Sequence, residues 1–242
     1  MRPIFVVLYN DTFPLAALEM AKKMAVAFNQ EVKLLLFDEQ FLSAQISDFE
    51  YSVVNKKDLS KFTEDADASM ILFEISANPS AKSIQNLLQC CRTLRMPYLF
   101  VKQGKSVDIS SVLVPITFLE EDREKAPFSS AFGRFLLAEI TLFTANDYGS
   151  KAKNNTNIIK TLLNSFDLKY NVQTAQKDSF GVEKEAIEKA LEENYNLVIL
   201  SASREYGLDD WLFGPKELKL IKKSKVALML INPRADLYAL CD

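Results

Sequence analysis

The chain has 242 residues, of which 48% are hydrophobic, and a formal net charge of −3. This length accommodates one or two domains, and the interspersed charges argue against a nucleic-acid or anionic-membrane surface, which would need a basic patch. The sequence contains no histidine, which excludes Ser-His triads, histidine general bases and histidine-ligated zinc.

In the first half, continuous apolar runs predict strands buried on both faces, and apolar residues at three-four spacing predict helices between them. The strands are expected at 4–9, 31–37, 51–55, 70–75 and 97–102, and the helices at 14–28, 41–46, 59–65 and 80–94. Five strands alternating with four helices predict a doubly wound α/β domain.

A short polar connection, 103–111, separates this half from a second one, so we place the domains at 1–104 and 110–242. The strands of the second half are expected at 112–116, 139–144, 170–175, 197–200 and 226–231, and the helices at 128–137, 155–165, 182–194 and 215–224. The charge run 120–124 is interpreted as a solvated loop.

The two halves repeat each other in residues as well as in element order. MILFEIS and PYLFVK of the first half match LVILSAS and ALMLINP of the second, and IFVVLYND matches SVLVPITF. Each copy is long enough to bury its own core, so the repeat predicts a domain duplication.

The chain also has no run of eighteen apolar residues, and its start, MRPIFVVLYND, lacks a signal peptide's cleavage site. We therefore expect a soluble, cytoplasmic protein. Its cysteines, Cys90, Cys91 and Cys241, form neither a disulfide framework nor a metal-binding spacing. A redox role for the vicinal pair is the less favoured alternative.

Ligands of open α/β sheets bind beyond the carboxyl ends of the strands, which directs attention to the loop 201–214 after the fourth strand of the second half. This loop reads SAS-REYG-LDDWLFG and precedes a helix that begins with Pro215. Trp211, Leu212 and Phe213 are expected to pack the loop onto the protein, with a ligand or partner contact as the alternative.

With this loop, the duplicated order and the VLVP opening of its second half, the chain resembles a tandem universal stress protein of the UspA type over nearly its whole length. The resemblance implies two five-stranded parallel-sheet domains of the adenine nucleotide alpha hydrolase-like fold, each with strand order 3-2-1-4-5. It also implies pairing through the last strands, 98–101 and 226–231, within the chain as a pseudo-dimer or between chains as a homodimer.

ATP-binding members of the family resemble one another in the pattern G-x2-G-x9-G-[ST], where glycines and a helix N-terminus hold phosphates. On this chain the pattern falls on Ser201, Arg204, Gly214 and Pro215, and only Gly214 matches. Gly207 coincides with a further glycine of such loops.

Two more positions complete the candidate nucleotide site that the resemblance implies. Lys216 could clamp an anion together with Arg204, although a solvated loop is the simpler interpretation. Thr117 takes the place of the family's adenine-contacting aspartate, which in the first half falls on Asn10 or Asp11. The matching loop of the first half, 76–80, contains no glycine.

We therefore expect a universal stress protein that does not bind ATP and acts as a dimeric interaction module without catalysis, cofactor or metal. The alternative is a sensor that binds ATP or AMP, or slowly hydrolyses ATP, through the loop 201–216. A nucleotidyl-transferring enzyme of a related fold is the least supported hypothesis, because the sequence has no P-loop and no metal cluster.

Overall fold

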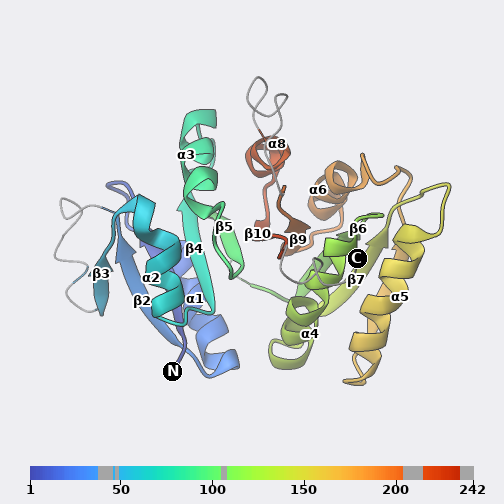
Figure 1. The fold of residues 1–242 in the computed structure, drawn as a ribbon, viewed down its shortest axis with the longest axis horizontal. Helices are drawn as coiled ribbons and strands as arrows, with labels where there is room; N and C mark the ends of the chain where they lie inside the picture. The colour runs from blue at the N-terminus through green and yellow to red at the C-terminus, as the bar shows by residue number, and fades with distance from the viewer. Residues whose placement is uncertain (38–45, 47–48, 105–107, 204–214, 235–242) are drawn as a thin grey trace. The chain divides into compact units, whose positions relative to one another are not determined.

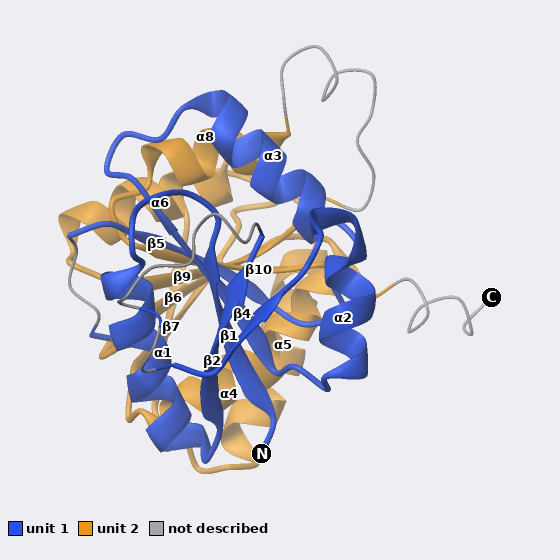
Figure 2. Ribbon diagram, turned by 90° about the vertical axis from the view of Figure 1, so that its left-hand side faces the viewer, with its two compact units in different colours: residues 1–108 blue, residues 109–242 orange. Residues whose placement is uncertain are grey.

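A computed structural model of the chain describes residues 1–37, 46, 49–104, 108–203 and 215–234. The chain forms two compact units, residues 1–108 and 109–242, shown in different colours in Figure 2. The expected helix at 41–46 and the aromatic residues at 211–213 lie outside the described residues, except for Ile46. None of the described helices is long and apolar enough to cross a membrane.

Unit 1 is a parallel sheet with helices on both faces (Figure 1). Its elements are β1 (Pro3–Leu8), α1 (Leu15–Phe28), β2 (Glu31–Leu36), β3 (Tyr51–Val53), α2 (Leu59–Asp65), β4 (Met70–Ile75), α3 (Ala81–Cys91) and β5 (Tyr98–Lys102). The strand order is β3-β2-β1-β4-β5, which is the 3-2-1-4-5 order predicted. Every residue of β1, β4 and β5 is buried, as their apolar runs predicted.

Unit 2 repeats the same topology. Its elements are β6 (Ser111–Ile116), α4 (Lys125–Phe135), β7 (Glu139–Thr144), α5 (Lys151–Asn164), β8 (Tyr170–Thr174), α6 (Val182–Glu192), β9 (Leu197–Ser201), α8 (Lys216–Lys223) and β10 (Ala227–Ile231). The strands lie in the order β10-β9-β6-β7-β8, again parallel. Helices α4 and α5 pack against each other and against β6 and β7, and α6 packs against α8 and β9.

The sequence placed the start of two helices too late. Helix α4 begins at Lys125 and not at Phe128, because Pro127 lies inside its first turn, where proline is tolerated. A 3-10 turn over Glu120–Glu124 precedes it. Helix α5 begins at Lys151 and not at Asn155, so its polar first turn hid the start of the helix.

Among the described residues, five other than glycine adopt the left-handed backbone conformation, and all of them follow helices. Four are Asn or Asp, the types that tolerate this conformation best. The exception is Leu137, which has φ 56° and is 84% exposed, so packing does not explain a leucine there. The Ala138 amide closes the end of α4 on the Phe132 carbonyl, 3.2 Å away.

Leu137→Asn should therefore raise the stability of the protein. The left-handed conformation costs a β-carbon-bearing residue roughly 1–2 kcal/mol, and asparagine relieves part of this cost. We expect a gain of up to about 1 kcal/mol, or about 2–4 °C in Tm, by thermal unfolding. The reverse change at an equivalent helix end, Asn194→Leu, should lower Tm; a lower Tm for Leu137→Asn would contradict the explanation.

Candidate functional site

The switch point of unit 2 lies between β6 and β9, where the direction of the strand connections reverses. Ligands of doubly wound sheets bind in the crevice outside the carboxyl ends of such strands. In this chain a side chain of the protein occupies that place. The carboxylate of Asp122 accepts hydrogen bonds from the Thr117 amide, just after β6, and from the Ser201 hydroxyl, 2.7 Å away at the end of β9.

Lys125 in the first turn of α4 neutralises this carboxylate. Its Nζ atom lies 2.7 Å from Asp122 Oδ1 and donates a second hydrogen bond to the Pro115 carbonyl, also at 2.7 Å. Both side chains are fully buried, at 1% and 0% exposure. The interpretation of the charge run 120–124 as solvated was therefore wrong for Asp122, whose partners lie as far as 79 residues away in the sequence.

Burial alone would raise the pKa of the Asp122 carboxyl. The neighbouring charge of Lys125, with hydrogen bonds from Lys125, Ser201 and Thr117, outweighs burial and lowers the pKa below its ordinary value of 3.8. Asp122 is therefore an anion at neutral pH. A phosphate at the switch point would therefore compete with Asp122 for Lys125 and for the donors of Thr117 and Ser201.

The remaining described residues of the candidate site are also engaged internally. Lys216 pairs with Glu183 at 3.0 Å. Burial would lower the pKa of Lys216, but Glu183, with Glu217 and Asp122 farther on, raises it. Glu217, 1% exposed in the first turn of α8, accepts hydrogen bonds from the amide and hydroxyl of Ser203.

Of the six residues proposed from the sequence, Thr117 and Ser201 thus converge on Asp122, and Lys216 lies apart from them, against α6. Arg204, Gly207 and Gly214 lie outside the described residues. Sequence reasoning missed Asp122 and Lys125. Their i,i+3 spacing directly after a buried strand was the available signal, together with Pro127, which marks a first helical turn.

In unit 1 the corresponding place is also taken by a carboxylate. Glu74 on β4 is 8% exposed, and its Oε2 atom accepts a hydrogen bond from the Ala17 amide, 3.0 Å away in the first turn of α1. Burial raises the pKa of Glu74, and hydrogen bonds from the Ala17 and Ala16 amides oppose the increase. The free N–H groups that would attract an anion to this helix start are therefore occupied.

The carboxylates of Glu74 and Asp122 come from different positions in the repeated topology. Strand pairing aligns Ile4 with Met70 in unit 1 and Val112 with Leu197 in unit 2, so Glu74 and Ser201 hold the same place in the register. In unit 2 that place holds a hydroxyl, which donates to a carboxylate from another segment.

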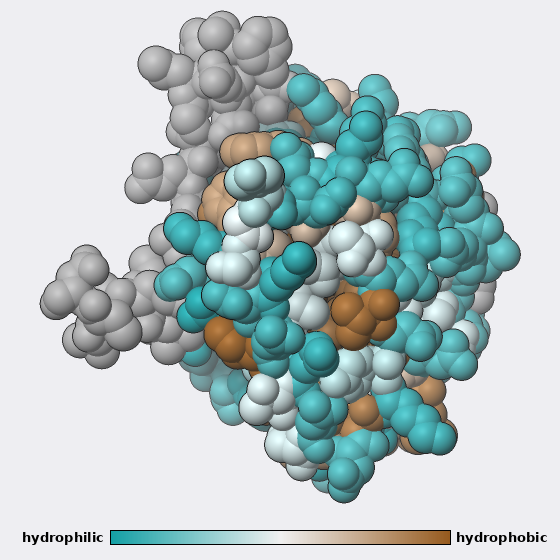
Figure 3. All heavy atoms as spheres, turned by 90° about the vertical axis from the view of Figure 1, so that its right-hand side faces the viewer, coloured by the Kyte–Doolittle hydropathy of each residue, from teal (hydrophilic) through white to brown (hydrophobic). Residues whose placement is uncertain are grey.

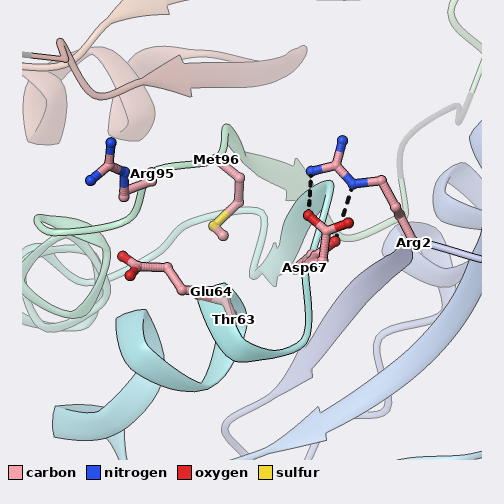
Figure 4. A pocket seen from close by; sticks show the side chains of 7 residues that line it. Arg2, Thr63, Glu64, Asp67, Arg95 and Met96 are labelled. Atoms are coloured by element: carbon pink, nitrogen blue, oxygen red, sulfur yellow. Dashed lines mark hydrogen bonds and ion pairs between the residues drawn. The ribbon is translucent and has the colours of Figure 1, made fainter.

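A pocket of about 320 Å³ lies at the other end of the strands of unit 1, next to their amino ends. Figure 4 shows the Arg2 guanidinium turned toward the Asp67 carboxylate, which lies 3.0 Å away. The other lining residues are Thr63, Glu64, Ala68, Arg95 and Met96. Opposite charges thus meet in the pocket wall, which gives it no preference for anions.

Metal and thiol chemistry receive no support from the described residues. No group of three or more potential acidic or cysteine metal ligands occurs among them. Burial raises the pKa of the Cys90 thiol and, more strongly, that of Cys91, so neither thiol is activated at neutral pH. Cys241 lies outside the described part of the chain.

Lys125→Met should destabilise unit 2 strongly, because it leaves Asp122 as an unpaired buried charge. Loss of one partner of a buried ion pair costs roughly 3–5 kcal/mol. In urea denaturation followed by circular dichroism, Lys125→Met/Asp122→Asn should recover part of the loss. A single variant as stable as the wild type would show that the pair contributes nothing.

The pair of Asp122 and Lys125 should also make the free energy of unfolding depend on pH in the acid range. Because folding lowers the pKa of Asp122, its contribution is present above its ordinary pKa of 3.8 and is lost as the pH falls through the lower folded value. Between pH 5 and pH 3, the wild type should therefore lose more free energy of unfolding than Lys125→Met/Asp122→Asn. Parallel losses would assign the acid sensitivity to other groups.

No protein-family model matches the sequence, and no curated protein matches it. Solved structures do match the fold. A universal stress protein from Archaeoglobus fulgidus DSM 4304 has a TM-score of 0.68 at 13% identity, with 96% of this chain and 97% of that chain covered.

Two proteins from Pseudomonas aeruginosa are similar to the same extent. A putative universal stress protein of strain UCBPP-PA14 has a TM-score of 0.66 and a functionally unknown protein of strain PAO1 one of 0.67, each at 13% identity. The alignments cover 96% of this chain and 93% and 92% of those chains, respectively. The resemblance predicted from the sequence is thus confirmed for the fold, and the chain has the fold of the tandem universal stress proteins.

Proposed function

We propose that this chain is a universal stress protein of the kind that does not bind nucleotides, and that it acts by binding other proteins without catalysing a reaction. The observation that supports this proposal most directly is the buried carboxylate of Asp122 across the switch point of unit 2. Glu74 closes the corresponding place in unit 1.

Binding of a phosphate at the switch point would break the buried pair of Asp122 and Lys125. To reach the Thr117 amide and the Ser201 hydroxyl, a phosphate would have to displace Asp122 from both and separate it from Lys125. Breaking such a pair costs roughly 3–5 kcal/mol, which weakens binding by more than about 100-fold. Lys216, at the start of α8, is itself paired with Glu183.

As part of this proposal the protein works in the cytoplasm and needs no cofactor. Its oligomeric state follows from pairing through the last strands, within the chain or in a homodimer. The last strands, β5 and β10, consist mainly of apolar residues. Static light scattering distinguishes a monomer from a dimer.

The competing function is binding of ATP or AMP, with at most slow hydrolysis, by the segment 201–216. The side chain of Lys216 favours it, because this ammonium group stands at the start of α8 and remains 42% exposed despite its pairing with Glu183. Basic groups beside a helix N-terminus suit phosphate.

Calorimetric titration of ATP with magnesium into the full chain should give no binding heat, and denatured protein should release no co-purified nucleotide. The Tm in 5 mM ATP should also be unchanged, since a ligand at a hundred times its Kd would add about 2.7 kcal/mol.

Micromolar binding would overturn the nucleotide part of the proposal. In that case Lys216→Met should abolish the binding, while Lys219→Met, an exposed lysine on the same helix, should leave it intact. ATP turnover lost in Lys216→Met alone would establish the competing function.

A further inference from the structure

Strand β8 forms one edge of the sheet of unit 2. It pairs with β7 on one side, and none of the described strands lies on its other side. Val172 in the middle of the strand is 47% exposed, and Asn171 and Thr174 are exposed as well. A free strand edge presents a row of unpaired N–H and C=O groups, which can form hydrogen bonds with another strand.

The usual protection of a free edge is missing from β8. Native proteins protect such edges with charged side chains, proline, a bulge or a very short strand. The strand reads YNVQT, with no charge and no proline, and its five residues pair with β7 in unbroken register. Strand β3, at the edge of unit 1, has only three residues. Of these two edges, β8 is therefore the better suited to pair with another strand.

The pairing with β7 shows which residues of β8 direct their backbone groups outward. The Ala175 amide donates to the Thr144 carbonyl of β7, 2.8 Å away. Because the direction of the backbone groups alternates along a strand, Tyr170, Val172 and Thr174 direct their N–H and C=O groups away from β7. These three residues are spaced evenly about Val172.

We propose that β8 pairs antiparallel with β8 of a second copy of the chain, about a two-fold axis at Val172. This axis places Val172 opposite its own copy and Tyr170 opposite Thr174, so that all of the outward-directed groups meet. Each of the three pairs exchanges two hydrogen bonds, which gives about six across the interface. The central valines also contact each other, and paired β-branched side chains stabilise a sheet. The interface is separate from pairing through β5 and β10 and goes beyond the function proposed above.

The charges that flank β8 in the chain are compatible with the same register. Continued beyond the strand, the register places Asp167 of one copy opposite Lys177 of the other, and Lys169 opposite Ala175. Asp178 falls opposite an uncharged residue, Phe166, so no like charges stand directly opposite each other. The edge is thus complementary to itself, as a two-fold interface requires, and this favours a second copy as the occupant.

Backbone hydrogen bonds would contribute more to this interface than apolar contacts. Figure 3 views the molecule from the side on which α5, the helix before β8, lies in Figure 1, and there apolar groups stand separately among hydrophilic ones. Small interfaces are typical of transient complexes. We therefore expect a weak dimer that forms at high protein concentration.

Oxidative crosslinking of cysteine variants tests the register directly. In the full chain with Cys90→Ser/Cys241→Ser, Val172→Cys should form a disulfide-linked dimer with diamide, because Cα atoms of a hydrogen-bonded pair are about 5.5 Å apart. The matched control, Asn171→Cys, should crosslink at least tenfold more slowly, since residue 171 and its copy would be about 7–8 Å apart. Equal crosslinking of the two variants, or of neither, would overturn the proposed pairing.

Sedimentation velocity over a hundredfold range of concentration measures the dimer itself. Val172→Lys should raise the dimer Kd at least tenfold, because two like charges would stand opposite each other at the axis. Val53→Lys on β3, where the replaced side chain is 41% exposed, should leave the Kd unchanged. Asp167→Lys should also weaken the dimer, and Asp167→Lys/Lys177→Asp should restore it.

A chain that remains monomeric at the highest concentration would overturn the proposal. A dimer that survives Val172→Lys unchanged would overturn it as well and would assign self-association to another edge, such as the last strands. Nucleotide binding is measured separately by calorimetry, so the two proposals can fail independently.

Discussion

The carboxylate of Asp122 is the point at which three segments of unit 2 meet. Its oxygens contact the end of β6 through Thr117, the end of β9 through Ser201 and the first turn of α4 through Lys125. A buried charge is tolerated only when its hydrogen-bonding capacity is used and its charge is compensated, and both conditions are met here. This buried ion pair therefore links the end of β6, the end of β9 and the start of α4.

In this protein the hydrogen-bond donors at the switch point are bonded to the protein's own carboxylates. Doubly wound sheets offer a crevice where strand connections diverge, and backbone amides there suit anions. In this protein Thr117, Ser201 and the first turn of α1 keep those donors, but each already serves an internal carboxylate. Among the described residues, these donors therefore bond to the protein's own carboxylates.

Most of the fold could be predicted from the sequence because its strands are continuous apolar runs and its helices show three-four periodicity. The strand order followed from the resemblance, and nearly all elements lie within a few residues of their predicted positions. The site could be predicted only in part. Thr117 and Ser201 were named by their positions in a motif, and their role as nucleotide contacts stays a prediction, whereas Asp122 looked like one member of a solvated charge run.

The difference between the two outcomes is physical. The spacing of apolar residues along a segment shows which of its faces packs against the core, and this spacing can be read from the segment alone. The burial of Asp122 depends on a hydroxyl 79 residues away and on a lysine whose own burial depends on the Pro115 carbonyl. A charged residue next to a strand has no local pattern that reveals such partners. The exposed leucine at 137 was hidden for the same reason, since its backbone conformation is set by the end of α4.

The register shared by Glu74 and Ser201 shows that one place in the fold can be filled from two parts of the chain. In unit 1 the carboxylate stands on the strand itself, whereas in unit 2 the strand supplies a hydroxyl and the carboxylate comes from the segment before a helix. Two units with the same strand order therefore need not carry their buried carboxylate at the same sequence position.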